Sequence, residues 1–143
     1  MKIGARLFLL LTILLTSCTL KRDFPVYQYQ EYSSLKPFTI SFPDSTKTYN
    51  IELSCRLPDS YEEPFLPLTI YYTSPSGQTF VDIANLPIER SKISNAKYLD
   101  INWDYRKGIV PKEKGNWTMS FTNDYAHNSI IGIGVKVYPN NNE

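Results

Sequence analysis

The chain has 143 residues and a formal net charge of +1, and 42% of its residues are hydrophobic. This length allows one domain with a hydrophobic core, and the nearly neutral charge gives no reason to expect nucleic acid as a partner. One histidine and two cysteines are too few ligands for a zinc site, so we expect no metal and no cofactor.

Residues 1–17 have the order of a bacterial export signal, in which Lys2 and Arg6 precede an apolar run at 7–15. That run is about half the ~20 residues that a membrane-spanning helix needs. The sequence LTSC that ends at Cys18 resembles a lipobox, where lipoprotein processing attaches diacylglycerol to the cysteine and cleaves before it. We therefore expect a mature protein held on a membrane by lipid on Cys18. An ordinary secretory signal with a chance cysteine is the alternative.

Residues 18–34 are predicted to be the lipidated cysteine and a tether, because they follow neither a period of 2 nor one of 3.6. A flexible tether of this length reaches roughly 20–25 Å, although Phe24, Val26, Tyr27 and Tyr29 leave open that part of it packs on the domain or on a partner. Thr19 is not the aspartate that retains some lipoproteins at the inner membrane. Lys21 and Arg22 stand where an acidic surface-export signal would lie. We therefore expect the outer membrane, on its periplasmic side.

Residues 35–139 are predicted to form a single all-β domain, with a short tail at 140–143. The clearest strand is 48–57, where five apolar or aromatic residues alternate with polar ones and Cys55 is in phase with the core. Pro67 cannot donate a ladder hydrogen bond, so its end of a strand is expected at a sheet edge or bulge. Seven short strands between turn residues are typical of a β-sandwich, Ig-like or jelly-roll-like. They are 38–42, 48–57, 65–73, 78–83, 98–105, 116–122 and 130–138, with a helical turn within 91–97.

The residues that carry chemistry do not assemble into a recognisable active site. His127 is the single histidine, and no nucleophile motif accompanies it. Asp100, Asn102 and Asp104 alternate along one strand, which favours a solvent-facing row over the alternative of a calcium site. The GIG sequence at 132–134 lacks the third glycine and the helix of a dinucleotide site. We therefore expect a protein that is not an enzyme.

Aromatic residues are the most informative side chains for binding, since the chain has eleven tyrosines and two tryptophans. Aromatic residues in phase with a strand's core face are expected to be buried. Those out of phase or in loops are candidates for an exposed interface, either as anchors for a protein partner or as platforms that stack on sugars. The candidates are Tyr61, Tyr71, Tyr72, Tyr105 and Tyr125.

Several short motifs of the β domain match one known family. They are FTISF at 38–42, the Tyr-x-Ile at 49–51 followed by Arg56, the Pro-x-Gly at 75–77 followed by Asp82, the Gly-x-Trp at 115–117, and the closing IGIGV at 131–135. With the lipobox, they make the chain resemble the GldH-type gliding-motility lipoproteins of Bacteroidota. The resemblance implies a membrane-anchored, non-enzymatic accessory component of the gliding apparatus and the associated type IX secretion system.

Two functions follow from these observations as hypotheses. The first is a lipid-anchored envelope protein that binds protein partners, for which pairing at the strand end near Pro67 is one contact mode. The alternative is a surface lipoprotein that binds glycans with exposed aromatic residues. A groove with two or more coplanar exposed aromatic rings would favour the alternative.

Overall fold

A computed structural model describes residues 26–90, 97–123 and 130–140. The predictions for the signal peptide, Cys18, the helical turn, Tyr125 and His127 lie outside these residues. Eight strands build the described part of the chain, with one 3-10 turn at Tyr32–Ser34. They are β1 (Val26–Glu31), β2 (Phe38–Phe42), β3 (Tyr49–Pro58), β4 (Phe65–Thr73), β5 (Thr79–Pro87), β6 (Tyr98–Ile109), β7 (Gly115–Thr122) and β8 (Gly132–Pro139).

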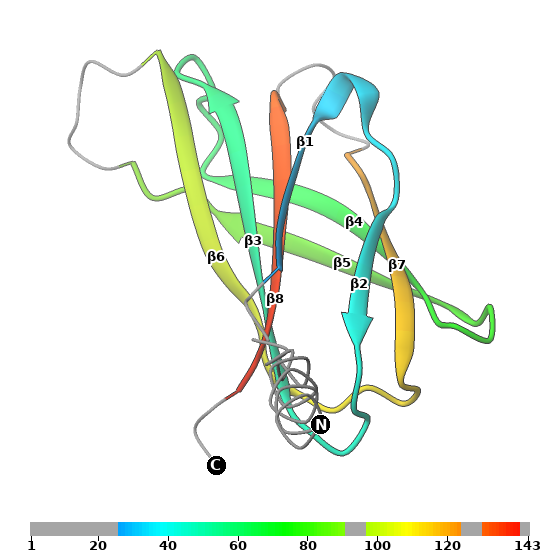
Figure 1. Ribbon diagram of the computed structural model, residues 1–143. Coiled ribbons are helices and arrows are strands. Elements are labelled where there is room, and N and C mark those ends of the chain that lie inside the picture. Colours follow the sequence, from blue (N-terminus) through cyan, green and yellow to red (C-terminus); the bar gives the residue numbers. More distant parts are fainter. Residues whose placement is uncertain (1–25, 91–96, 124–129, 141–143) are drawn as a thin grey trace, which may run out of the picture.

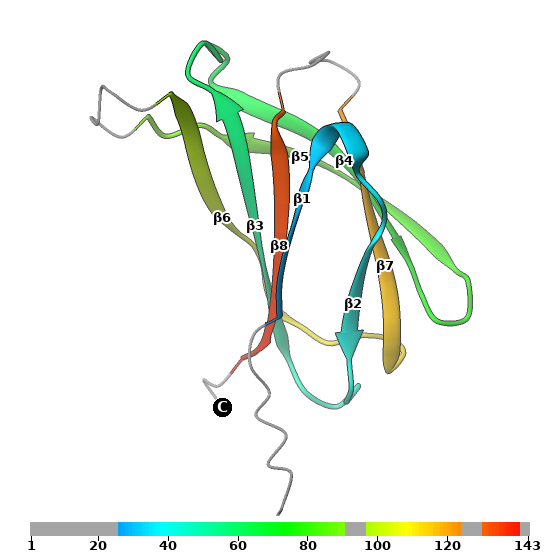
Figure 2. The same ribbon diagram turned by 45° about the horizontal axis from the view of Figure 1, so that its top comes forward.

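The strands form two antiparallel sheets packed face to face, which confirms the predicted β-sandwich (Figures 1 and 2). We call them sheet A, with the strand order β1-β8-β3-β6, and sheet B, with the order β2-β7-β4-β5. The outer face of sheet A is turned toward the viewer in Figure 1, and β4 and β5 of sheet B cross behind it. Each sheet therefore has one face in the core and one face in solvent.

Alternation along the strands produces the core, as the sequence predicted. In β3 every second residue from Tyr49 to Leu57 is buried, and the residues between them are half-buried. Cys55 is one of the buried residues, with 3% of its surface exposed. The predicted core faces of β2 and β7 are also buried, with Phe38, Ile40, Phe42, Trp117, Met119 and Phe121 at 8% exposure or less.

Strand β1 shows that the tether prediction is wrong for Val26–Glu31 and that the alternative, in which part of this segment packs on the domain, is right. These six residues pair with β8 in a continuous antiparallel register. The alternation of β1 is inverted, because Gln28 and Gln30 lie opposite core residues of β8 while Tyr27 and Tyr29 lie opposite its outward-facing residues. The Gln28 amide donates a 2.6 Å hydrogen bond to the Thr39 carbonyl of β2 and so joins the two sheets. Because Gln28 and Gln30 are polar but lie on the inner face, the hydrophobic alternation that predicts a strand is missing from β1.

Pro67 lies in an internal strand, β4, but at the end of it that β7 does not cover. Strand β7 pairs with Thr69–Thr73, whereas β5 pairs with the whole of β4. Because β7 does not pair with Pro67, the missing N–H of Pro67 leaves no hydrogen bond between β4 and β7 unmade. The expectation of an edge for this end of the strand is therefore confirmed on the β7 side. On the other side of β4 lies β5, the edge strand of sheet B, which continues to Pro87, four residues past its predicted end.

Candidate binding surfaces

The structure changes which tyrosines can take part in binding. Tyr61 is 5% exposed and its hydroxyl donates a 2.8 Å hydrogen bond to a main-chain carbonyl. Tyr72 and Tyr105 are partly buried between the sheets, and their hydroxyls are 2.7 Å apart. The expectation of exposure is therefore wrong for these three residues. Tyr71 is exposed at 36%, and Tyr125 lies outside the residues that the structure describes.

A polar cluster joins the sheets where β6 meets β5. Tyr72 donates to Tyr105, Tyr105 donates to the carboxylate of Asp82, and Arg106 donates to the same carboxylate over 2.6 Å. Burial opposes the charge of Asp82, but hydrogen bonds from Tyr105 and Arg106 outweigh it and lower its pKa. Burial is also the main reason that the pKa of Tyr105 rises to about 12. The cluster thus keeps one carboxylate charged and holds two tyrosines neutral, which suits a structural bridge.

Two tyrosines that the sequence placed in the tether dominate the outer face of sheet A. Tyr27 is 56% exposed and Tyr29 is 42% exposed. They lie over Gly134 and Gly132 of β8, because a Cβ atom on Gly132 would overlap the Tyr29 hydroxyl and Cζ, and one on Gly134 would lie 2.6 Å from the Tyr27 hydroxyl. Side chains normally stand away from a sheet. These two rings instead lie down across the neighbouring strand, in the space that the glycines leave.

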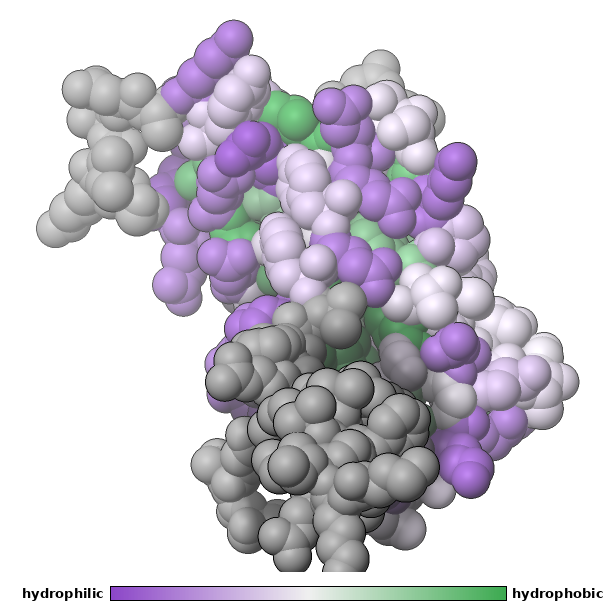
Figure 3. Space-filling model, viewed as in Figure 1, coloured by the Kyte–Doolittle hydropathy of each residue, from purple (hydrophilic) through white to green (hydrophobic). Residues whose placement is uncertain are grey.

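Polar side chains of β3 and β6 continue this surface beside the rings. The Tyr27 hydroxyl is 3.1 Å from the Ser54 hydroxyl. Arg56 donates two hydrogen bonds, of 2.7 and 2.9 Å, to the carboxylate of Asp100, and these bonds are the main reason that the pKa of Asp100 is lowered. A depression of about 480 Å³ is lined by both tyrosine rings and by Ser54, Arg56, Asp100 and Asn102. In Figure 3, hydrophilic and intermediate side chains cover most of the described part of this face.

The three polar residues of the proposed calcium alternative share this face but do not converge. Asp100 is engaged by Arg56, and Asp104 forms a 2.7 Å ion pair with Lys107. Within the described ranges, no group of three or more His, Cys, Asp or Glu residues could hold a metal ion. The row therefore fits the favoured interpretation, a solvent-facing strand.

The outer face of sheet B differs from that of sheet A in having no charged residue on its strands. Its most exposed apolar side chains are Ile83 at 74%, Val81 at 58%, Phe65 at 51% and Tyr71 at 36%. Tyr71 and Val81 face each other across β4 and β5, and Ile83 belongs to the adjoining outward-facing pair, so these three side chains form one patch. Phe65 lies two outward-facing pairs beyond Ile83, at the other end of β4. The outward-facing residues are Thr39, Ser41, Phe65, Pro67, Thr69, Tyr71, Thr73, Thr79, Val81, Ile83, Asn85, Pro87, Asn116, Thr118, Ser120 and Thr122.

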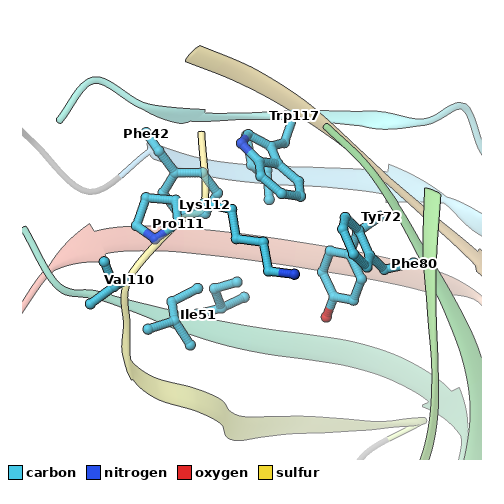
Figure 4. A pocket seen from close by; sticks show the side chains of 10 residues that line it. Phe42, Ile51, Tyr72, Phe80, Val110, Pro111, Lys112 and Trp117 are labelled. Atoms are coloured by element: carbon cyan, nitrogen blue, oxygen red, sulfur yellow. The ribbon is translucent and has the colours of Figure 1, made fainter. Parts of the chain in front are cut away.

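A third feature is an apolar cavity of about 250 Å³ at one end of the sandwich, between the sheets (Figure 4). Its walls come from both sheets and from the connection after β6. Lys112 is the only charged residue among them, and its ammonium group lies 5.1 Å from the centre of the Phe80 ring. The lining residues are Ile40, Phe42, Ile51, Tyr72, Phe80, Ile109, Val110, Pro111, Lys112 and Trp117. The polar groups in this lining include the Lys112 ammonium group and the Tyr72 hydroxyl, which donates to Tyr105.

Cys55 is the free thiol of the described residues, and its surroundings disfavour reactivity. It is buried in the core, and burial raises the pKa of its thiol to about 12. A nucleophilic cysteine needs the opposite, a lowered pKa and access to solvent. Cys55 therefore packs as a small apolar residue, as the sequence indicated.

No protein-family model matches the chain, and no curated protein matches it either. No described helix is long and apolar enough to cross a membrane. The surfaces must therefore be interpreted from their own geometry. The sequence analysis placed Tyr27 and Tyr29 in the tether and not among the interface candidates, although one signal was present. A Gly-x-Gly pair in a strand leaves two gaps that a Tyr-x-Tyr pair on the neighbouring strand can fill.

Proposed function

We propose that this protein is a lipid-anchored, non-enzymatic component of the cell envelope that binds protein partners through the outer face of sheet B. The observation that carries the proposal is the patch of Tyr71, Val81 and Ile83 on a face whose strands carry no outward-facing charge. Contiguous exposed apolar side chains on a soluble domain are typical of interaction sites. Depletion of charged residues is typical of the centre of an interface.

The position of the patch strengthens this interpretation. Val81 and Ile83 belong to β5, which has a hydrogen-bonded neighbour, β4, on one side only. Natural edge strands are protected by charges, prolines or inward-pointing charged residues. Strand β5 has the inward-facing Asp82 and the terminal Pro87, but its solvent-facing side chains from Thr79 to Asn85 carry no charge. The partner that fits is a protein segment with uncharged, alternately apolar side chains, packed on this face and along this edge.

The lipid on Cys18 supplies the other half of the proposed function. A lipid-held domain stays within the reach of its tether, so its effective concentration near membrane-bound partners is high. A weak contact at the sheet B face is then sufficient for a lasting complex. With the resemblance to the GldH-type lipoproteins, this favours an accessory role in gliding or type IX secretion at the outer membrane, on the periplasmic side.

Cross-linking in the native envelope, followed by recovery of the tagged protein and mass spectrometry, tests the proposal. Ile83→Lys places a charge in the centre of the patch, where its 74% exposure makes a folding defect small, within about 0.5 kcal/mol. Tyr98→Lys is the matched control, since Tyr98 is 39% exposed and begins β6 of sheet A, away from the patch. We expect gliding or type IX secretion components with the wild type and with Tyr98→Lys, and their loss with Ile83→Lys. Equal recovery with both variants contradicts the proposed surface.

A further inference from the structure

We infer that the outer face of sheet A is a carbohydrate-binding site, on which the sugar rings of a neutral glycan chain stack on Tyr27 and Tyr29. This goes beyond the proposed function, because it assigns a different ligand to the opposite face of the sandwich. The inference rests on the two rings, the glycines beneath them and the polar side chains beside them.

The glycines make the tyrosine rings a platform. A Cβ at Gly132 would overlap the hydroxyl end of Tyr29, and one at Gly134 would overlap the Ser54 hydroxyl and lie 2.6 Å from the Tyr27 hydroxyl, so both glycines leave the space over β8 that these side chains use. Both tyrosines stay open to solvent there, with an exposure of 56% for Tyr27 and 42% for Tyr29. The negative face of an aromatic ring attracts the weakly positive C–H groups on one side of a pyranose. Each ring is therefore suited to one sugar.

The spacing of the rings suits a chain rather than a single sugar. Tyr27 and Tyr29 are two positions apart on β1, so their attachment points are about 6.6–6.8 Å apart on the same face. Two neighbouring platforms in line along a strand can hold successive units of a linear polymer. The depression of about 480 Å³ that both rings line continues this line toward β3 and β6.

Hydrogen-bonding groups beside the rings match the hydroxyl groups of a sugar. Arg56 uses two of its five donors on Asp100, and the Asp100 carboxylate keeps further acceptor positions. Their side chains are 42% and 60% exposed, so these positions are open to solvent. Ser54 and Asn102 line the same depression and add a hydroxyl and an amide. Bidentate pairing fixes the orientation of Arg56 and Asp100 before any ligand binds.

The charges of this face favour a neutral ligand. Arg56 is paired with Asp100, and Lys136 is paired with Glu52 over 2.9 Å. Single-stranded nucleic acid also stacks on aromatic side chains, but it needs a groove of positive charge to follow its backbone. The paired charges here do not form one, which leaves an uncharged, hydroxyl-rich chain as the ligand that fits.

Binding measurements with the full lipidated chain test the inference, in a detergent without a sugar headgroup, which would compete. One arm uses isolated peptidoglycan sacculi, and the other uses soluble neutral oligosaccharides of β-1,4-linked glucose and N-acetylglucosamine. We expect binding in at least one arm, and that arm identifies the source of the glycan. Tyr29→Ala and Tyr27→Ala should each weaken it about tenfold or more, whereas Tyr29→Phe, which keeps the ring, should remain within about twofold of the wild type.

Two further variants separate a platform from a structural cover. Gly132→Ala keeps the Tyr29 side chain but displaces its ring, so it should weaken binding as Tyr29→Ala does. Tyr71→Ala removes an exposed tyrosine from sheet B and should leave binding unchanged. Absence of binding in both arms overturns the inference, and so does binding that Tyr27→Ala and Tyr29→Ala do not weaken. Ile83→Lys should bind glycan normally, so a failure here is distinct from a failure of the protein-binding proposal.

Discussion

Replacing Gly132 by alanine tests directly whether the Tyr29 ring lies where the structure places it. In an ordinary strand, Gly→Ala stabilises a protein by about 0.5–1 kcal/mol, because alanine has less conformational freedom to lose on folding. At Gly132 the added methyl group would overlap the hydroxyl and Cζ of Tyr29 and would lie 3.0 Å from the Gln30 carbonyl oxygen. The ring must therefore leave its position over β8 before the methyl group can fit.

The magnitude follows from the surface that the ring would lose. Tyr29 is 42% exposed, so more than half of it is covered. A tyrosine buries roughly 150–250 Å² when fully covered, so about 100 Å² is at stake, worth at most ~2.5 kcal/mol at about 25 cal/mol per Å². After the gain from alanine is subtracted, we expect Gly132→Ala to destabilise the protein by about 1 kcal/mol.

The sign should reverse when Tyr29 is already alanine. In the Tyr29→Ala background only the Gln30 carbonyl stays close to the new methyl group, and β1 is an edge strand that can move by a few tenths of an ångström. Gly132→Ala should then stabilise by about 0.5–1 kcal/mol, which gives a coupling energy of about 2 kcal/mol between the two sites. Urea unfolding of the four proteins measures it. Additive effects, with coupling below about 0.5 kcal/mol, would refute the position of the ring.

Three other predictions concern the anchor, the polar cluster and the buried thiol. Cys18→Ser should move the protein out of salt-washed membranes, and a variant that still sediments with them would disprove the lipid anchor. The pKa of Asp82 is lowered on folding, so its contribution to stability is present at neutral pH and is lost as the pH falls below about 4 through the folded-state pKa. The stability difference between wild type and Asp82→Asn should therefore shrink in acid, as thermal unfolding at several pH values will show. Cys55 should resist alkylation at pH 8 until the protein is unfolded, which labelling with and without urea measures.

The sequence predicted the sandwich well where alternation and burial agree. Residues 48–57 have an unbroken alternation, and β3 is buried at every second position. Strand β6 was predicted to end at Tyr105, but it continues to Ile109 through basic residues that suggested a loop. Arg106 is held there by Asp82 of the other sheet, a contact that no local pattern contains. An alternation of apolar and polar residues reveals a strand only where one of its faces is in the core and the other is in water.

The candidate surfaces were harder to predict, because exposure depends on how distant strands meet. Tyr72 and Tyr105 lie 33 residues apart and bond to each other, which removes both from the surface. Tyr27 and Tyr29 were assigned to a tether because the glutamines between and after them point to the core side. The amides of Gln28 and Gln30 are satisfied by main-chain carbonyls near β2. A strand with polar residues on its inner face can be recognised only when the main-chain groups that its side chains bond in the other sheet are known.

The pairing of β1 with β8 has a mechanical consequence for a protein held by its N-terminus. With the lipid on Cys18 that we propose, any pull between membrane and partner enters the domain at Val26, along the direction of β1. Hydrogen bonds of an antiparallel pair run across the strands, so such a pull shears all six residue pairs between β1 and β8 at once instead of opening them in turn. Tyr27 and Tyr29, seated over the glycines of β8, would have to slide with them. With that proposed anchor, β1 would resist force between the lipid and the sandwich through its six paired residues.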